Sequence, residues 1–463
     1  MTTADAPRLE HDLIGTREIP TNARYGVHAL RAAENFARPR AQLLCDMPEL
    51  CAALGMVKLA AQRANLETGA LAPRTAWAIG EAAEDLIADR HGLRKDLIVP
   101  LVQGGAGTST NMNVNEVLAN RALALLGHAT GEYQYCHPND HVNRSQSTND
   151  VYPTAMRIAL IFRASTLEQA ASQLEQALRA VAREHDQTPK LGRTQLQDAV
   201  AMSVGDEFDA WADAVANAHQ ALVFQRAALL EVNLGGTAIG TGLTASAQYC
   251  DRVIPLLSDI SGLPIRRAAR HISATTDSSS LLNYSGALRG LAVALAKVAN
   301  DLRLLSSGPN GGLGELRLPA VQGGSSMMPG KVNPVIAEFV NQLAFRIRGS
   351  DAAVAAALDA AQLQLNAMLP LVVSELLNSQ EDLYCAMDAL RVRCISGIVV
   401  NRQRHAELVQ HNLGELTSIA ASGGYALATR AAQLSDGAQK VAVSHAGREV
   451  NRTGGHLDPD QAH

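Results

Sequence analysis

The segment GGSSMMPGKVNPV, residues 323–335, combines acid–base side chains with a backbone composition poorly suited to a regular helix or strand. Its glycines and prolines predict a loop that bends sharply and can open and close. A serine hydroxyl ionises far above neutral pH, so a serine base needs backbone N–H groups and a nearby ammonium to stabilise its alkoxide. Ser325, with Lys331 close by in the sequence, is such an arrangement. A flexible linker between helices is the alternative that this segment alone leaves open.

A second polar segment, GGAGTSTNMNVNE at 104–116, comes directly before an apolar helical run. Glycine lets the backbone approach a ligand closely, and Thr108 provides a hydroxyl where the predicted helix begins. The free N–H groups of a helix N-terminus attract carboxylates and phosphates. The segment lacks the Gly-Lys-Ser/Thr ending of a phosphate-binding loop. It is therefore either a small-anion site or an ordinary capped junction.

The segment CHPNDHVNRSQSTNDVYPTA, residues 136–155, places a third polar group ahead of a long apolar helix. Capping uses one or two such side chains, which leaves most of them unexplained. Ser147, Thr148 and Asn149 stand where the chain enters the predicted helix, a position suited to binding a carboxylate. The histidines match no common zinc or iron spacing, so we expect no metal here.

A fourth group, GRTQLQDAVAMSVGDEF at 192–208, includes Thr194 and Gln195 at what the pattern predicts is another helix start. One polar group at a helix end is ordinary. Several of them, far apart in the sequence, indicate the parts of one divided active site.

Composition predicts the framework that must position these residues. The chain has 463 residues, beyond the size at which single cores stop growing, so two or three domains are expected. Hydrophobic residues make up 47% and aromatic residues only 3%, which favours closely packed helices over sheets. We expect an N-terminal, mixed but mainly helical domain (1–145), a central long-helix bundle (146–395) and a small helical C-terminal domain (396–463). Alanine-rich long helices also predict packing against copies of the same chain.

Charge and cysteine usage exclude several classes of function. The net charge is −5 and no run of Lys and Arg resembles a phosphate-binding surface, so nucleic acid and anionic membrane are not expected partners. The six cysteines are scattered without a CxxC pair, which argues against a zinc site or a disulfide framework. The N-terminus lacks an apolar signal segment and no stretch is apolar enough to span a bilayer, so we expect a cytoplasmic protein.

Together the polar segments resemble those of the aspartase/fumarase superfamily, and within it the aspartate ammonia-lyases. GSSMMPGKVNP at 324–334 is similar to the superfamily signature GSSxMPxKxNP. QGGAGTSTNMNVNEVLANRA, HPNDHVNRSQSTNDVYPTAM, GRTQLQDAV and the opening DLIGTREIPTNARYGVHALRAAENF resemble the family's other blocks, in the same order. The resemblance implies a mainly α-helical, three-domain protomer with a central long-helix bundle. It also implies a homotetramer with a twenty-helix core, in which three subunits share each active site.

The resemblance further implies a role for each candidate residue. Ser325 would be the base that removes the Cβ proton of L-aspartate, and Lys331 the cation that stabilises the resulting aci-carboxylate. Ammonia would leave by anti elimination to give fumarate, without a metal or an organic cofactor. The implied substrate-binding residues are Ser326 and Asn333 near Lys331, Thr108, Ser147 and Thr148 around the dianion, and Asn149, Thr194 and Gln195 facing the amino group or the α-carboxylate.

Two glutamines favour an ammonia-lyase over a fumarase. Fumarases typically carry a histidine at the position of Gln195 and a glutamate at the position of Gln322, and neither glutamine exchanges protons near neutral pH. Asn310 stands where the family pattern has a basic residue, and the chain from 364 onward resembles aspartases least. The alternatives are a lyase for a related amino dicarboxylate or an N-substituted aspartate, a fumarate hydratase, and a non-catalytic helical scaffold.

Overall fold

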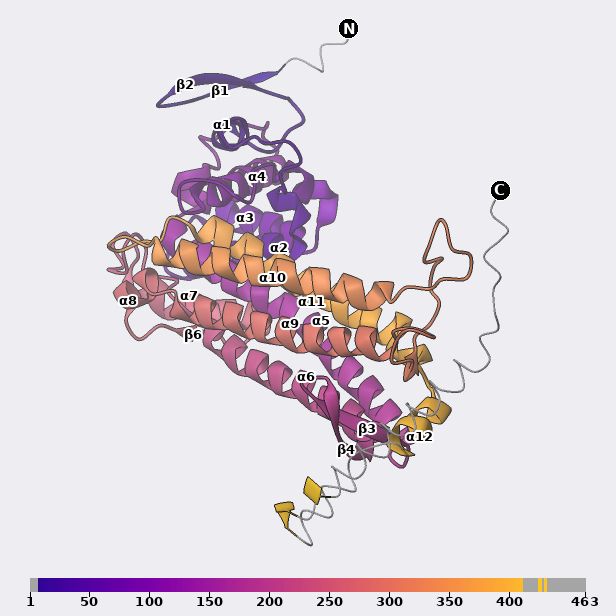
Figure 1. Ribbon diagram of the computed structural model, residues 1–463. Helices are drawn as coiled ribbons and strands as arrows, with labels where there is room; N and C mark the ends of the chain where they lie inside the picture. Colours follow the sequence, from indigo (N-terminus) through magenta and orange to yellow (C-terminus); the bar gives the residue numbers. More distant parts are fainter. Residues whose placement is uncertain (1–6, 411–423, 427–428, 431–463) are drawn as a thin grey trace, which may run out of the picture. The chain divides into compact units, whose positions relative to one another are not determined.

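The computed structural model describes residues 7–410, 424–426 and 429–430, which form a mainly α-helical fold with short two-stranded sheets (Figure 1). The chain divides into two compact units. Unit 1 comprises Met1–Ala177, Trp211–Arg303 and Ala320–Ser396, and unit 2 comprises Leu178–Ala210, Leu304–Pro319 and Gly397–His463. The division into three domains at residues 145 and 395 stays a prediction, and the expected C-terminal domain lies largely outside the described residues.

The N-terminal part of unit 1 is a cluster of short and medium helices. Its elements are β1 (Arg8–Asp12), β2 (Gly15–Ile19), α1 (Val27–Asn35), α2 (Pro48–Glu67), α3 (Pro73–Ile87) and α4 (Thr108–Leu126). β1 and β2 form an antiparallel hairpin, while α3 packs against both α2 and α4. Ala53, Ala60, Ala61 and Ala64 of α2 are fully buried, and side chains this small let the neighbouring helices approach closely.

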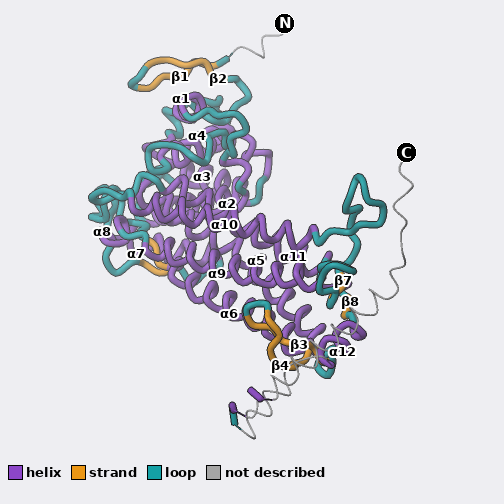
Figure 2. The backbone as a smooth tube through the Cα atoms, in the orientation of Figure 1, coloured by secondary structure: helices purple, strands orange, loops and turns teal. Residues whose placement is uncertain are grey.

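Long helices form the rest of unit 1, and Figure 2 shows them as a bundle. The long helices are α5 (Thr148–Glu184), α6 (Val204–Ala227), α9 (Ser279–Leu305), α10 (Val335–Asp359) and α11 (Leu369–Arg393). Shorter elements between them are β5 (Glu231–Val232), α7 (Ala247–Ser261), β6 (Arg266–Arg267) and α8 (His271–Thr276). Leu288, Leu291, Leu295, Val298 and Leu302 form a buried stripe along α9. None of the helices in the described ranges is long and apolar enough to cross a membrane.

Side-chain contacts give the relative directions of α5, α9 and α10. Arg157 Nη1 of α5 donates to Ser280 Oγ of α9 at 2.8 Å. Three residues further along α5 and four further along α9, Gln380 Nε2 of α11 donates to Leu160 O at 2.9 Å and to Tyr284 Oη at 2.7 Å, so α5 and α9 run in the same direction. The helix α10 runs the opposite way, as two pairs of contacts between α9 and α10 indicate. These are Ser285 Oγ to Asp351 Oδ1 at 2.7 Å and the side chains of Asn300 and Asn341 at 2.8 Å.

Unit 2 contains the segment GRTQLQDAV, for which the prediction of a helix start is wrong. The segment forms an antiparallel hairpin of β3 (Pro189–Thr194) and β4 (Gln197–Ser203), and the next helix begins only at Val204. The helix start is set instead by Ser203 and Asp206, because Ser203 N donates to Asp206 Oδ2 at 2.8 Å and Asp206 N to Ser203 Oγ at 2.9 Å. This reciprocal pair is a capping box.

Three further elements belong to the described part of unit 2. β7 (Leu316–Arg317) pairs with β8 (Val399–Val400), and α12 (Arg402–Gln410) packs against β3.

Short turns connect several of the main elements of the chain. 3₁₀ turns occur at Leu44–Asp46, Arg90–Asp96, Ala228–Leu230 and Ile395–Gly397, and a π turn at Pro138–Val142.

Candidate active site

The first turns of α4 and α5 lie side by side, which brings two of the candidate residues together. Asn111 Nδ2 donates to Thr148 Oγ1 at 3.2 Å. Thr108 is three residues before Asn111 and therefore lies on the same face of α4. Gly107, directly before α4, has φ 89°, and a Cβ added there would lie 2.5 Å from Cγ of the buried Tyr152 of α5. Only glycine therefore permits this close approach of the two helix starts.

A network of hydrogen bonds fixes the first turn of α5, and the prediction that a helix begins here is confirmed. Asn149 N donates to Ser147 Oγ at 3.3 Å, and Ser147 N donates to Asp150 Oδ1 at 3.0 Å. The other oxygen of the fully buried Asp150 accepts Gly235 N at 3.1 Å and Thr237 N at 2.9 Å. One carboxylate thus ties the helix start to a turn far away in the sequence.

Neighbouring groups offset the cost of burying the charge of Asp150. Burial raises its pKa to about 6, while the backbone N–H groups of Ser147, Thr237 and Gly235 and the positive charge of Lys58 act in the opposite direction. Each of these groups stabilises the ionised form. The charge therefore belongs to a preorganised network and is not an isolated buried ion.

Lys58 of α2 is a cation that the sequence analysis did not identify. Its side chain has no exposed surface, and its Nζ donates to Asn143 Oδ1 and to Gln146 Oε1, both at 3.0 Å. Burial lowers the pKa of this ammonium to about 7. Asn143 Oδ1 also accepts Asn111 Nδ2 at 3.1 Å, so the lysine is linked through hydrogen bonds to the starts of both α4 and α5. The only signal in the sequence was one charged residue inside the apolar run CAALGMVKLAAQ.

The cluster around these helix starts has unused hydrogen-bonding capacity. Within the described part of the chain, several buried oxygen atoms have no hydrogen-bond partner, namely Thr110 Oγ1, Asn111 Oδ1, Asn115 Oδ1 and Thr237 Oγ1. Buried polar atoms are normally paired. The positive ends of two helix dipoles, together with these oxygens, suit a small ligand that carries both negative charge and hydrogen-bond donors.

The loop before α10 arranges the hydroxyl oxygen of Ser325 as a hydrogen-bond acceptor. Ser325 Oγ accepts Met327 N at 3.1 Å and Met328 N at 2.9 Å. Two backbone N–H groups directed at one hydroxyl oxygen are the arrangement that stabilises an oxyanion. The side chain is half-buried, while both methionines and Ser326 are exposed.

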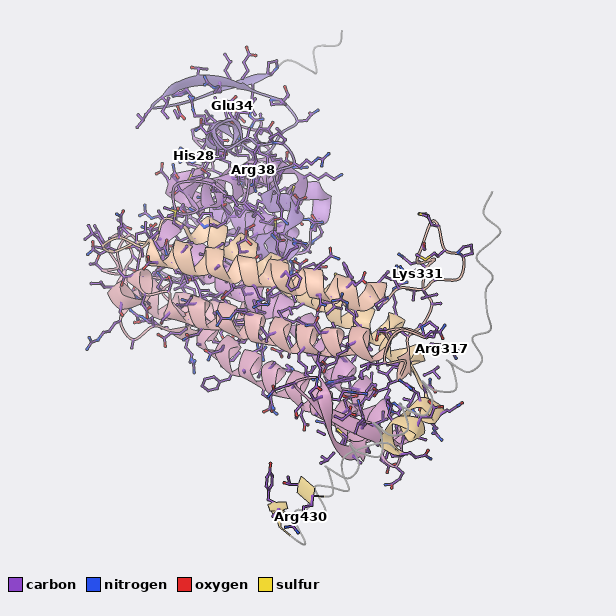
Figure 3. All side chains as sticks on the ribbon, in the orientation of Figure 1. His28, Glu34, Arg38, Arg317, Lys331 and Arg430 are labelled. Atoms are coloured by element: carbon purple, nitrogen blue, oxygen red, sulfur yellow. The ribbon has the colours of Figure 1, made fainter. Side chains whose placement is uncertain are left out.

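The same loop closes on itself and brings the backbone of Lys331 beside that of Gly324. Gly324 N donates to Lys331 O at 2.8 Å, and Asn333 Nδ2 donates to Gly324 O at 2.6 Å. A Cβ on Gly324 would lie only 2.5 Å from Lys331 O. The Lys331 side chain is exposed on this loop (Figure 3). Ser325, Lys331 and Asn333 therefore form one compact group.

One chain places this loop and the two helix starts at opposite ends of the bundle of unit 1. Leu160 of α5 and Tyr284 of α9 share the partner Gln380, and the next residue of α9, Ser285, contacts Asp351 of α10. At a rise of about 1.5 Å per residue, Thr148 lies about 18 Å from this level along the axis in one direction, and Val335 lies about 24 Å from it in the other. The loop and the helix starts are therefore about 40 Å apart along the axis, and one chain does not bring them together.

The last two candidate residues, Thr194 and Gln195, belong to unit 2. Both are exposed at the tip of the β3–β4 hairpin, where Thr194 pairs with Gln197. His137 instead has a local role, since its Nδ1 accepts Asn139 N at 3.1 Å at the start of the π turn. Among the described residues, no group of three or more His, Cys, Asp and Glu side chains is placed to hold a metal ion.

Comparison with known proteins gives matches over most of the chain. Residues 15–349 match a family whose description is "Lyase". The aspartate ammonia-lyase of Pseudomonas fluorescens is 48% identical over 435 residues, which cover 94% of this chain and 90% of that protein. The aspartate ammonia-lyase of Escherichia coli (strain K12) is 46% identical over 413 residues, which cover 89% of this chain and 85% of that protein.

Solved structures give the same picture. The cobalt-bound fumarate lyase:delta crystallin of Brucella melitensis superimposes with a TM-score of 0.90 and is 46% identical, covering 95% of this chain and 96% of that one. A class II fumarase from Schistosoma mansoni has a TM-score of 0.88 and is 31% identical, covering 92% of each chain. The similarity therefore includes the long-helix bundle as well as the polar segments.

Proposed function

The chain belongs to the lyase family of the aspartase/fumarase superfamily, and from that premise we propose that it is an aspartate ammonia-lyase, which converts L-aspartate to fumarate and ammonia. The observation that carries the proposal is the hydroxyl of Ser325, which accepts two backbone N–H groups on a loop that also holds Lys331 and Asn333. The aspartate ammonia-lyases reported above, 46% and 48% identical, support the choice of substrate.

The first step is proton removal from Cβ. The Ser325 hydroxyl first releases its own proton to solvent. The resulting alkoxide takes the Cβ proton, and the electron pair of the broken C–H bond moves into the β-carboxylate, which becomes an aci-carboxylate with a second negative charge. A proton beside a carboxylate is very weakly acidic, so most of the rate enhancement must come from groups directed at those oxygens. Lys331 and Asn333 supply a positive charge and an amide N–H, with Ser326 beside them.

The second step breaks the C–N bond. The aci-carboxylate returns its electrons to form the Cα–Cβ double bond, and ammonia leaves from the face opposite the abstracted proton. An amino group that enters the site as ammonium needs no added proton before it departs. A hydration site would need a group that transfers protons to and from water, and Gln195 and Gln322 do not supply one.

Substrate binding falls to the two helix starts and the hairpin. Thr108, Ser147 and Thr148 provide hydroxyls at helix N-termini, where a dicarboxylate is favoured by the helix dipole. Asn149, Thr194 and Gln195 complete the site toward the amino group or the α-carboxylate.

The protein would assemble as a homotetramer of three-domain protomers, with a twenty-helix core and three subunits at each site. The separation of about 40 Å between loop and helix starts along one bundle supports such sharing. Unpaired apolar surface on the bundle helices also supports it, because exposed patches of this kind mark protein interfaces. The exposed side chains are Leu282 and Val293 of α9, Phe339 and Phe345 of α10, and Tyr384 and Val392 of α11.

A direct assay tests the function. The purified protein is incubated with L-aspartate, and fumarate is followed by its ultraviolet absorbance. We expect steady formation of fumarate from L-aspartate and at least about 100-fold less from L-malate, since a site without a proton-transfer group for water loses a factor of this size. Equal turnover of malate would instead identify a fumarase, and turnover of only N-substituted aspartates would identify a lyase of altered specificity.

A further inference from the structure

The tip of the β3–β4 hairpin has a strained backbone. Gln195 has φ 53° and Leu196 φ 62°, so both central residues of this two-residue turn lie in the left-handed region. Turns of this kind normally use Asn-Gly or Gly-Gly, because other L-residues clash there with their own backbone. The side chain of Leu196 is 69% exposed, and those of Thr194 and Gln195 are also exposed. Burial of the tip therefore does not hold the turn, so the restraint must come from contacts made by the strands of the hairpin.

A buried ion cluster lies along β3, the first strand of the hairpin. Arg193 Nη1, next to Thr194 in the chain, lies 2.6 Å from Oε1 of Glu315, a carboxylate with no exposed surface. Lys190 of the same strand lies 3.6 Å from the other oxygen of Glu315 and 2.5 Å from Oε2 of Glu207. The two cations and two carboxylates balance in charge, which makes their shared burial tolerable.

Glu315 is itself fixed from both sides. Its N–H donates to Leu305 O at 2.9 Å, and its carbonyl accepts Asn401 N at 2.9 Å. His405 Nδ1 of α12 lies 3.5 Å from its Oε2. The carboxylate thus sits where the β3–β4 hairpin, the start of β7 and α12 meet, and all of these belong to unit 2.

We propose that Glu315 is a positioning residue of the active site, which holds the hairpin through Arg193 in the strained turn that presents Thr194 and Gln195 to the substrate. Strained backbone persists only where the surroundings fix it, and it concentrates at functional sites. Glu207 is the natural comparison, because it belongs to the same cluster and contacts Lys190. The substrate named in this inference rests on the proposed function, whereas the restraint of the turn by Glu315 does not.

The first experiment compares Glu315→Gln with Glu207→Gln. Glutamine keeps the shape of the side chain and removes its charge, so each variant tests one carboxylate of the cluster. We expect Glu315→Gln to lower kcat/KM for L-aspartate by about 100-fold, the size expected when a binding group moves by about 1 Å. Glu207→Gln should stay within about threefold of the wild type, because Glu207 pairs with Lys190, four residues before Thr194 in the chain. Equal losses in both variants would overturn the proposal.

The second experiment asks whether Glu315 acts through Arg193. We expect Arg193→Gln alone to lower kcat/KM. The Arg193→Gln/Glu315→Gln double variant should have a kcat/KM no lower than that of the less active single variant, because the effects of coupled residues are not additive. Glu315→Asp, which keeps the charge, should recover at least about tenfold over Glu315→Gln. Additive losses, or no recovery in Glu315→Asp, would contradict a positioning role.

The third experiment needs no substrate. Amide hydrogen exchange in the free protein should become about tenfold faster in Glu315→Gln for residues 193–198, with α12 and β7 changed much less. Faster exchange throughout unit 2 would mean that Glu315 only stabilises the fold, and unchanged exchange would mean that it does not hold the hairpin. If the wild type does not convert aspartate, the proposed function is wrong, and the exchange result still decides the structural claim.

Discussion

Ser325 lies on a loop whose neighbouring side chains are mostly exposed, whereas Thr148 lies in a helix turn in which it and Asp150 are buried. The loop is held by a few bonds of its own, such as Gly324 N to Lys331 O at 2.8 Å. The helix start is held by Asp150 and by Lys58, both fully buried. A base that must reach the substrate and return needs freedom to move, while a binding site gains from being fixed before the substrate arrives. Under the proposed function, the molecule separates these requirements between two regions.

The largest expected effect comes from the exposed loop that carries Ser325. Ser325→Ala removes the proposed base, and we expect kcat to fall by at least about 1,000-fold, within the range for losing a general base. Affinity for L-aspartate, measured by calorimetric titration, should change by less than about threefold, because the binding groups remain. Ser326→Ala is the matched control and should cost about tenfold. Comparable losses in both serines would remove the distinction between the base and its neighbour.

Asp150→Asn tests the fixed region. The amide would direct an N–H group toward backbone donors that now share a carboxylate oxygen, so buried groups lose their partner. We expect the free energy of unfolding in urea to fall by about 2–3 kcal/mol and KM to rise by about tenfold. Asp140→Asn, in which the side chain is 78% exposed, is the control and should change neither quantity. A stable Asp150→Asn enzyme with normal KM would show that the network is dispensable.

Two glycines with nearly the same backbone sharpen the comparison. Gly107 has φ 89° and would place a Cβ 2.5 Å from the Tyr152 ring, whereas Gly330 has φ 84° and nothing within 4 Å. Gly107→Ala should lower the free energy of unfolding by about 3 kcal/mol, from overpacking and left-handed strain together. Gly330→Ala should cost about 1 kcal/mol of strain within the loop, with kcat affected more than the melting temperature. A lower melting temperature for Gly330→Ala than for Gly107→Ala would contradict the contrast between the tightly packed helix starts and the exposed loop.

The smallest expected effect is a pH dependence that comes from Lys58. Burial lowers its pKa to about 7, below the ordinary value of 10.5. Between these pH values the unfolded chain binds more protons than the folded one, so the free energy of unfolding rises with pH, by at most about 1.4 kcal/mol per unit. Asp150, whose pKa burial raises to about 6, has its opposite effect at lower pH, between about 4 and 6.

Lys58→Met should flatten this rise. Urea unfolding at pH 7, 8 and 9 measures the slope for the wild type, for Lys58→Met and for the control Lys95→Met, which removes an exposed lysine. We expect the control to follow the wild type and Lys58→Met to gain less stability with pH. Identical slopes in all three proteins would mean that Lys58 stays charged in the folded state over this range.

Local sequence patterns predicted some of these features and missed others for physical reasons. The starts of α4 and α5 followed from a change of polar to apolar residues, which depends only on neighbours in the chain. The β3–β4 hairpin was mistaken for a helix start because its turn residues, Gln195 and Leu196, are not turn formers and are held by contacts from elsewhere. The Lys58 network was missed because burial of a cation depends on packing partners that periodicity does not reveal.

The antiparallel course of α9 and α10 has a genetic consequence under the proposed sharing of sites. A chain with Ser325→Ala keeps intact helix starts, and a chain with Thr148→Val keeps an intact loop. Each alone forms an inactive assembly. When both are produced in one cell, some mixed assemblies pair a sound loop with a sound helix start, so two null alleles complement one another.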